Sequence, residues 1–313
     1  MKRFLLPYLI CPACLPGEYP LTLAAEREAA DDIISGTLSC TKCKKRFPIK
    51  EGIAHLLPAP DSSPAGAQWR YEEKGMTDRY LWSHYGDLLG DTVIDGTAIQ
   101  WADCLSRAAT TGFDAGCSVG RITFEMAQRC NLAVGCDLSH GFIKPARSLA
   151  LKRELDFTLP LEGNLIERLH LSLPASWRTD NVEFVIADAL RLPFSANSFD
   201  QIASLNLLDR VSYPLAHLFE MNRVAAPRNA SFLFADPFSW STTAAPEERW
   251  LGGTTSGPYP GRGKDNVRAL LEGKDGILLP AWTIARTGTH AWKMRTHCNH
   301  YEVISSEYLV AER

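Results

Sequence analysis

The chain has 313 residues, which is more than one minimal domain needs and fits two structural units. Hydrophobic residues make up 45% of it, enough for a substantial core, and the formal net charge of −3 gives no overall basic surface for nucleic acid. Because no run of about 18 apolar residues occurs, the sequence predicts no membrane-spanning helix.

The cysteines fall into two groups. Cys11 with Cys14, and Cys40 with Cys43, form two Cys-x-x-Cys pairs, whereas the other five are scattered among apolar residues. An odd, scattered set argues against a disulfide framework and predicts a reducing, cytoplasmic location. Four thiolates on two short turns suit tetrahedral Zn²⁺, although a redox pair or two solvent-facing thiol pairs are alternatives. A site filled by four sulfurs has no open position for catalysis, so we expect the zinc to be structural.

The composition changes after the cysteine pairs. Residues 1–58 hold both pairs and are predicted to form a small zinc ribbon. Residues 59–79 begin with a stretch rich in proline, serine, alanine and glycine and are predicted to form a linker. Residues 80–313 are predicted to form the second domain.

The second unit alternates strands with helices. Predicted strands occupy residues 111–114, 132–137, 182–188, 199–205 and 230–235, and predicted helices occupy 71–89, 121–130 and 141–153. Roughly thirty residues before the third strand exceed an ordinary loop and are predicted to be an insertion. Two long strands within 282–311 are predicted to form an antiparallel hairpin that closes the sheet edge. This order predicts an α/β fold with a doubly wound, mostly parallel sheet.

The turn after the first predicted strand, residues 114–121, reads Asp-Ala-Gly-Cys-Ser-Val-Gly-Arg. Gly116 and Gly120 permit a tight turn whose backbone approaches a ligand at a helix N-terminus, and Ser118 is the next smallest choice. Such a turn alone is equally well explained as an ordinary strand–helix connection.

Three acidic residues stand at the ends of three successive predicted strands. Asp114 follows the first, Asp137 ends the second and Asp188 ends the third. Asp137 is placed to accept hydrogen bonds from ribose hydroxyls, and Asp188 from an adenine amino group. Each could singly be a strand-end cap. Together they surround the crevice where open α/β sheets bind ligands.

This order of motifs resembles the class I S-adenosylmethionine-dependent methyltransferases, as does Leu-Pro-Phe-Ser-Ala-Asn-Ser-Phe-Asp at residues 192–200. The resemblance covers most of residues 113–235 and departs at Ser118, where many members have glycine. It implies a seven-stranded Rossmann-like sheet and S-adenosylmethionine as cofactor. The residues that it assigns to the cofactor are Asp114, Gly116, Ser118, Gly120, Arg121, Asp137, Leu138, Asp188, Ala189 and Asn206. An NAD-binding fold is the main competitor, but its helix-opening Gly-x-Gly-x-x-Gly is absent.

Several stretches resemble more closely the methyltransferases that act on an imidazole nitrogen of thiol-substituted histidine in ovothiol formation. They are residues 80–86, 116–125, 161–164, 206–210, 236–240 and 249–253. The zinc ribbon lies outside this resemblance. The residues that we predict to be catalytic are Asp209, Tyr85 and His84, and those that we predict to contact substrate are Tyr80, Tyr85, Asn206, Asp209, Arg210 and Trp240.

Each of these residues has a physical role to play in such a reaction. Asp209 could orient or deprotonate an imidazole N–H, and Arg210 could hold a carboxylate; a local structural salt bridge is the alternative. Tyr80, His84 and Tyr85 are helically spaced and could form a lid, although plain packing would give the same spacing.

The ribbon leads to a second hypothesis. It resembles zinc modules attached to translation-related methyltransferases and to ribosomal-RNA guanine methyltransferases. An RNA base would then be the substrate, and the basic cluster at residues 42–46 would contact RNA, although a solvated loop explains that cluster as well. A non-catalytic, cofactor-binding regulatory subunit is the third hypothesis. The first prediction remains a small-molecule substrate; the sequence sets no oligomeric state.

Overall fold

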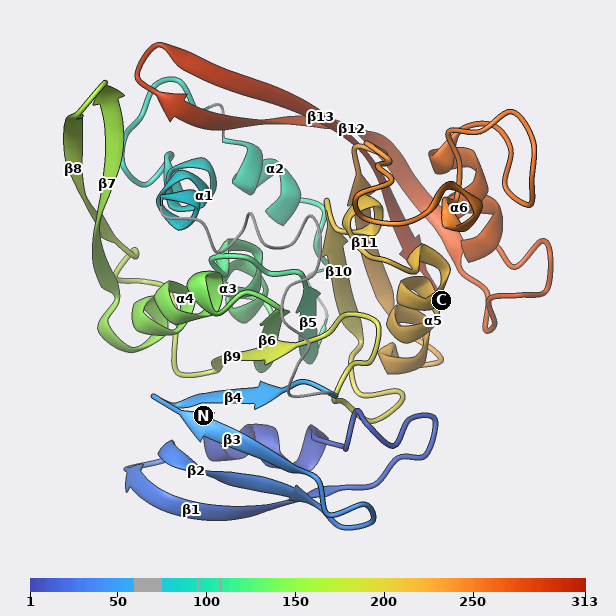
Figure 1. Ribbon diagram of the computed structural model, residues 1–313, viewed down its shortest axis with the longest axis horizontal. Coiled ribbons are helices and arrows are strands. Elements are labelled where there is room, and N and C mark those ends of the chain that lie inside the picture. The colour runs from blue at the N-terminus through green and yellow to red at the C-terminus, as the bar shows by residue number, and fades with distance from the viewer. Residues whose placement is uncertain (59–74, 95, 107–108) are drawn as a thin grey trace.

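The computed structural model describes residues 1–58, 75–94, 96–106 and 109–313 (Figure 1). Most of the predicted linker, residues 59–74, lies outside the described residues. The next helix, α1 (Met76–Tyr85), begins within the range predicted as linker. None of the helices in the described part of the chain is long and apolar enough to cross a membrane.

Eleven of the described strands form one large sheet, in the order β1-β2-β3-β4-β9-β6-β5-β10-β11-β13-β12 (Figure 1). Their bounds are β1 Leu21–Ala29, β2 Asp32–Cys40, β3 Arg46–Lys50, β4 Ile53–Leu56, β5 Thr111–Ala115, β6 Leu132–Asp137, β9 Val182–Ala187, β10 Gln201–Leu205, β11 Ser231–Asp236, β12 Thr283–His297 and β13 His300–Glu312. The strands from β9 to β11 are parallel, and β13 and β12 continue the sheet antiparallel. The predicted α/β sheet and its closing hairpin are thus confirmed.

The prediction of seven strands is too small for this sheet. Seven strands run from β9 to β12, but the four strands of the N-terminal module extend the sheet beyond β9. The junction is parallel pairing of β4 with β9, where His55 lies opposite Ile186 and Leu56 opposite Ala187. The first and last predicted units are therefore joined by backbone hydrogen bonds. The spacing of residues along the chain gave no signal for this pairing.

Helices cover both faces of the parallel strands. Their bounds are α2 Thr97–Ala102, α3 Arg121–Ala127, α4 His140–Lys152, α5 Pro214–Val224 and α6 Gly263–Leu271. Every residue of β9 is buried, as expected for a strand covered on both faces. Phe184 belongs to the cluster beneath α3 and α4, whereas its neighbour Val185 faces the opposite cluster, because successive side chains alternate across a sheet.

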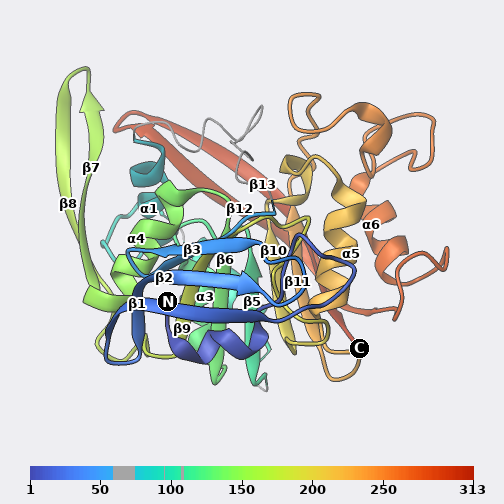
Figure 2. The same cartoon turned by 60° about the horizontal axis from the view of Figure 1, so that its bottom comes forward.

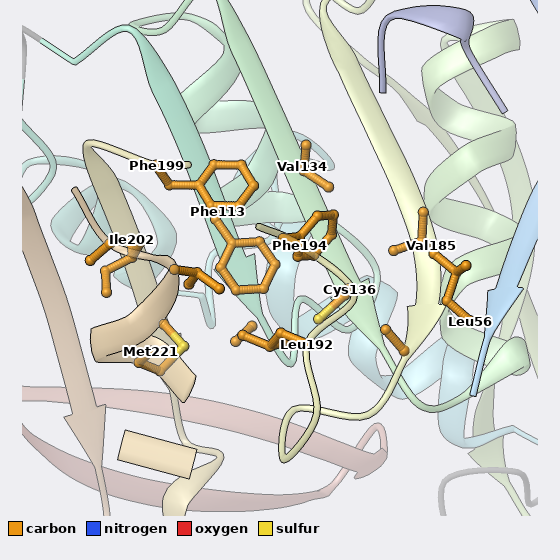
Figure 3. Close-up of a cluster of buried hydrophobic side chains, with 14 of the residues drawn as sticks. Leu56, Phe113, Val134, Cys136, Val185, Leu192, Phe194, Phe199, Ile202 and Met221 are labelled. Carbon is orange, nitrogen blue, oxygen red and sulfur yellow. The ribbon is translucent and has the colours of Figure 1, made fainter. Parts of the chain in front are cut away.

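The hydrophobic cluster on the Val185 side of the sheet joins the N-terminal module to the rest of the protein. Figure 3 shows Leu56 of β4 beside Val185 of β9, with Phe113, Phe194 and Phe199 packed further along the same face. These rings meet at centroid distances of 5.0–5.3 Å. Aromatic contacts of this size contribute strongly to a core, so the module shares its core with the α/β domain.

Buried charges reinforce the same junction. Arg147 of α4 is paired with Asp32 of β2 and with Glu183 of β9, and its side chain is almost fully buried. Removing one partner of such a group leaves an uncompensated buried charge, which is strongly destabilising. The pairing therefore requires the module and the domain to be held together in this arrangement.

The predicted insertion is structured. Strands β7 (Glu154–Glu162) and β8 (Leu165–Ser172) form a separate two-stranded sheet, at the left of Figures 1 and 2. Three-residue 3-10 helices follow β10 (η3, Leu208–Arg210) and precede α6 (η4, Glu247–Arg249). A longer one, η1 (Arg3–Tyr8), begins the module.

Candidate active site

A cavity of about 340 Å³ lies at the carboxyl ends of β5, β6, β9 and β10. The turns after these strands form one side of it. Helices α1 and α2 and the β12–β13 hairpin form the other side. In Figure 1 this hairpin extends beyond the sheet toward α1 and α2. The cavity thus occupies the position where open α/β sheets bind ligands.

The turn between β5 and α3 has the left-handed backbone that its composition predicts. The φ angles are +70° at Gly116, +49° at Ser118 and +86° at Gly120. A Cβ on Gly120 would stand 2.6 Å from the ring of Phe184. Gly120 does not line the cavity; its missing side chain lets α3 pack closely on the sheet. Gly116 does line the cavity, where the lack of a side chain leaves its backbone open to a ligand.

The side of the cavity formed by the turns after the strands is the candidate cofactor half. Ser118 tests whether this half fits a nucleoside cofactor. Its Oγ is buried and has no hydrogen-bond partner among the described residues, and the residue lines the cavity. A buried hydroxyl of this kind calls for a polar partner. A ligand with hydroxyl, carboxylate or ammonium groups, such as S-adenosylmethionine, would supply one.

The structure brings the three strand-end acids together on the cavity wall. Asp137 accepts hydrogen bonds from the backbone N–H groups of Ser118 (3.0 Å) and Ser139 (2.9 Å), which fix its carboxylate. Asp188 accepts from Leu190 N–H at 2.9 Å, and burial raises the pKa of its carboxyl. The wall is therefore acidic and suits a cationic ligand.

Asp114 is the most deeply buried of the three. Its carboxylate accepts a hydrogen bond from Thr123 Oγ1 at 2.8 Å. Burial, with a smaller contribution from the charge of Asp137, raises the pKa of Asp114 to about 7. Asp114 is therefore partly protonated at neutral pH while the cavity holds no cation.

The remaining residues predicted to contact the cofactor, Leu138, Ala189, Arg121 and Asn206, also line the cavity. The guanidinium of Arg121 donates two hydrogen bonds to Asp87 (2.6 and 2.9 Å) and one to the backbone carbonyl of His84 (2.9 Å). Arg121 therefore ties α3 to the end of α1 and fixes one wall of the site.

Helix α1 supplies aromatic side chains to the half of the cavity that α1, α2 and the β12–β13 hairpin form. Tyr80 and His84 both line the cavity, with ring centroids 5.7 Å apart. Tyr85 does not: it is buried, and its hydroxyl donates to the carbonyl of Val119 at 2.9 Å. Burial, assisted by the charge of Arg121, lowers the pKa of His84 to about 4. His84 is therefore neutral at physiological pH.

The loop after β10 supplies the predicted pair Asp209 and Arg210. Only one of the two side chains faces the cavity. Arg210 lines the cavity, and its Nε lies 3.1 Å from Oδ1 of Asp209. Asp209 is fully buried behind it and also accepts from Ser239 N–H at 2.8 Å. Asp209 thus fixes the orientation of a cation that faces the cavity. Trp240 does not line this cavity and stacks on Trp250, with ring centroids 6.2 Å apart.

Several lining residues were not predicted from the sequence. They are Arg79 of α1, Trp101 of α2, and Trp292, Met294, Glu302 and Ile304 of the hairpin. Strand alternation places 292 with 294 and 302 with 304 on one face, which the sequence could have shown. That this face covers the cavity depends on the packing of the hairpin against α1 and α2.

The four cysteines of the two pairs form the predicted metal site. All four Sγ atoms lie within 4.8 Å of one another. The Sγ–Sγ distance is 3.7 Å between Cys11 and Cys43 and 3.8 Å between Cys14 and Cys40. A tetrahedron with Zn–S bonds of about 2.3 Å has edges of about 3.8 Å, so the donor set and spacing fit structural zinc.

The turn that carries Cys11 and Cys14, which we call the zinc knuckle, is hydrogen-bonded to the loop that follows Asp188. Arg191 donates to the backbone carbonyls of Pro12 (3.0 Å) and Leu15 (3.1 Å), on either side of Cys14. Ile10 N–H donates to the carbonyl of Pro193 at 2.9 Å. The module therefore supports the part of the cavity wall next to Asp188.

Two protein-family models match separate parts of the chain. Residues 113–232 match the sequence model of a methyltransferase domain, and residues 2–52 match the model of Trm112p-like proteins. The methyltransferase match contains Asp114, Asp137 and Asp188 and most of the cofactor side of the cavity. No curated protein sequence matches the chain.

Solved structures with similar folds include three methyltransferase-related proteins. An S-adenosylmethionine-dependent methyltransferase from Methanosarcina mazei is 17% identical, covering 67% of this chain and 95% of that one, with a TM-score of 0.42. Magnesium protoporphyrin IX methyltransferase from Synechocystis PCC 6803, with bound S-adenosylmethionine, is 19% identical (78% and 94% covered, TM-score 0.43). A chain from the complex of the Haloferax volcanii Trm112 methyltransferase activator with a protein described as a methyltransferase is 13% identical (80% and 99% covered, TM-score 0.44).

Proposed function

We propose that this protein, an S-adenosylmethionine-dependent methyltransferase with an N-terminal Trm112p-like zinc module, methylates an imidazole nitrogen of a small molecule. A thiol-substituted histidine is the first candidate. The observation that carries the proposal is the acceptor half of the cavity. It is walled by Tyr80, His84, Trp101 and Trp292, with the oriented cation of Arg210 beside them.

The enclosure of this half favours a small acceptor over an RNA base. Helices α1 and α2 and the hairpin cover it, and the basic cluster at residues 42–46 contributes no lining residue. Of the lining arginines, Arg121 is paired with Asp87, and Arg79 with Glu302. RNA recognition instead calls for an accessible basic path with aromatic side chains along it.

The residues of the chain can then be given roles in the transfer. Bound S-adenosylmethionine supplies an electrophilic methyl group on a sulfonium, which an imidazole nitrogen can attack in line. Ser118, Asp137 and Asp188 would hold the cofactor. Arg210 would bind the acceptor's carboxylate bidentately. The covering helices and hairpin would exclude water and hold the reacting groups in line, which is the largest contribution to such a displacement.

The predicted catalytic residues take different roles in this proposal. Neutral His84 would accept a hydrogen bond from the acceptor's N–H and so direct the other nitrogen toward the methyl group. Asp209 would position Arg210, and Tyr85 would support the cofactor turn through Val119. No strong base is required, because a neutral imidazole already carries a nucleophilic lone pair, and the methylated imidazolium would release its N–H proton to solvent after the transfer.

We also propose that the module, within the predicted unit 1–58, acts as a built-in activator of the domain at 80–313. Its contacts with Arg191 and with β9 support this role, because they hold the wall beside Asp188. Zinc would keep the knuckle that carries the carbonyls of Pro12 and Leu15 in shape.

The experiment is methyl transfer from labelled S-adenosylmethionine, with thiol-substituted histidines and total RNA offered in parallel. We expect label on the imidazole compound, with the methylated nitrogen identified by NMR, and much less label with the Asp137→Ala variant at cofactor concentrations that saturate only the wild type. Label on RNA alone would replace this proposal with the RNA-modifying enzyme. Cofactor binding without any labelled acceptor would favour the regulatory subunit.

A further inference from the structure

The β12–β13 hairpin presents one continuous face to the cavity. Trp292 and Met294 of β12, and Glu302 and Ile304 of β13, all line it. In the hairpin register Trp292 lies opposite Ile304, and Met294 lies opposite Glu302. Trp292 and Glu302 are thus diagonal neighbours on one face, which is within reach of long side chains. The hairpin therefore forms a wall of the acceptor half as well as the edge of the sheet.

This wall is fixed to the helices across from it. Strand β12 is the edge strand, and three of its backbone carbonyls accept hydrogen bonds from side chains of α1 and α2. Thr97 Oγ1 donates to Ala291 at 2.6 Å, and Ser83 Oγ donates to Lys293 at 2.6 Å. Arg79 Nε donates to Arg295 at 2.9 Å. Because edge carbonyls covered in this way are held in place, the side chains between them have defined positions.

This wall carries two polar groups, the indole N–H of Trp292, which is a hydrogen-bond donor, and the carboxylate of Glu302, which is an acceptor. The indole Nε1–H of Trp292 is buried and has no hydrogen-bond partner among the described residues. A buried donor left unpaired is costly, and a buried tryptophan N–H usually finds a partner. The side chain of Glu302 is about half exposed and lies 3.4 Å from Nη2 of Arg79. A donor and a carboxylate placed diagonally complement a group that carries an anion and a cation side by side.

We propose that this hairpin face selects the acceptor by its α-amino acid group. This inference rests on the proposed function, since it concerns the acceptor side of the same cavity. The Trp292 N–H donates to the acceptor's carboxylate, to which Arg210 is the second donor. Glu302 accepts from the acceptor's ammonium. Arg79 is a positioning residue, because its bonds to the hairpin fix Glu302 at the cavity rim.

The test measures binding to the full-length protein loaded with S-adenosylhomocysteine, by calorimetry, with three probes. L-Histidine carries both charged groups, histamine lacks the carboxylate, and imidazole propionate lacks the ammonium. We expect the wild type to bind L-histidine at least about tenfold more tightly than either analogue, since each analogue lacks one of the two charged groups that the wall would bind.

Two variants separate the two contacts. Glu302→Gln should weaken L-histidine and histamine about tenfold and leave imidazole propionate unchanged. Trp292→Phe should weaken L-histidine and imidazole propionate and leave histamine unchanged. Glu312→Gln, an exposed carboxylate at the far end of β13, is the matched control and should change none of them. Unaltered affinity for S-adenosylhomocysteine would show that each variant folds.

The outcomes distinguish this inference from the proposed function. If the wild type binds none of the probes, or if both variants weaken all probes equally, the inference is overturned. If it methylates thiol-substituted histidine and its decarboxylated analogue equally well, the proposed function stands and the inference falls. If the probes bind with the expected selectivity but no imidazole is methylated, the inference stands and the substrate assignment fails.

Discussion

At one edge of the sheet the zinc module is bonded to the loop after β9, next to the acid expected to bind adenine. At the other edge the β12–β13 hairpin extends toward α1 and α2 (Figures 1 and 2), and its side chains line the acceptor half of the cavity. The module, whose residues 1–58 are all described, contributes no lining residue and contacts the domain through Arg191 and β4. The hairpin contributes four side chains directly. One addition to the sheet thus supports the cavity from behind, whereas the other forms its wall.

This difference predicts how the two edges respond to substitution. Changes at the module edge should alter cofactor binding and leave acceptor selectivity as it is. Changes at the hairpin should alter acceptor selectivity and leave cofactor binding as it is. Variants that moved both quantities together would show that the two halves of the cavity are coupled.

The largest effect is expected from removing zinc. Replacing Cys11 and Cys14 together by serine removes two of four ligands, and structural zinc contributes on the order of 10 kcal/mol to such modules. The module should unfold, and the affinity for S-adenosylmethionine should fall more than tenfold because the loop beside Asp188 loses its support. Zinc content, thermal unfolding and calorimetric titration of the cofactor measure these effects.

Arg191→Ala is the control for this variant. It keeps the zinc ligands but removes the hydrogen bonds to Pro12 and Leu15, so zinc content should stay the same. The two bonds contribute about 1 kcal/mol each, about 2 kcal/mol together, so cofactor affinity should fall by no more than about thirtyfold. Full cofactor affinity in both variants would contradict the supporting role of the module.

The next effect tests the cofactor half itself. In Asp137→Ala the dissociation constant for S-adenosylmethionine should rise about 10- to 100-fold, because hydrogen bonds to a charged carboxylate are lost. The carboxylate also orients the turn through Ser118 N–H and Ser139 N–H. Asp137→Asn, which keeps one acceptor oxygen, should lose less. An unchanged dissociation constant in calorimetry would count against the ribose assignment.

The cofactor half of the cavity could be predicted from the sequence better than the acceptor half, because the two halves are built from different kinds of contact. The cofactor half is local: each acid ends a strand, and parallel strands end at one edge, so Asp114, Asp137 and Asp188 could be grouped from the sequence. The cysteine pairs are also local. Two other features depend on contacts between segments that are far apart in the chain. They are the parallel pairing of β4 with β9 and the position of Trp292 over the cavity, and no periodicity in the sequence indicates either of them.

Helix α1 shows the same limit at smaller scale. Residues in a helix are separated by about 100° around its axis, so Tyr80 and His84 share a face whereas Tyr85 points well away from it. The sequence grouped all three as a lid. The structure places the first two on the cavity and turns Tyr85 toward Val119. Spacing thus shows which side chains are neighbours, but packing decides which face meets the cavity.

The smallest effect concerns protons and is confined to the cofactor half. The pKa of Asp114 is raised to about 7 by burial, so below pH 7 this carboxyl is mostly protonated in the free protein. A bound cation favours the ionised form and lowers that pKa. Binding of S-adenosylmethionine between about pH 6 and 7 should therefore release a fraction of a proton, and the release should fade above pH 8, where Asp114 is already ionised.

Calorimetry in buffers of different ionisation enthalpy measures this release. Asp114→Asn should abolish it while leaving Thr123 a hydrogen-bond acceptor. The raised pKa also means that the wild type loses stability as the pH rises from about 4 to about 7, and levels off above that, because in this range the carboxyl is ionised in the unfolded state and still protonated in the folded state. The asparagine variant should lack this loss, and Glu302→Gln at the other half should retain both the proton release and the pH dependence. Proton release that persisted in Asp114→Asn would assign it to another group of the cofactor half, of which Asp188, whose pKa burial also raises, is the next to test.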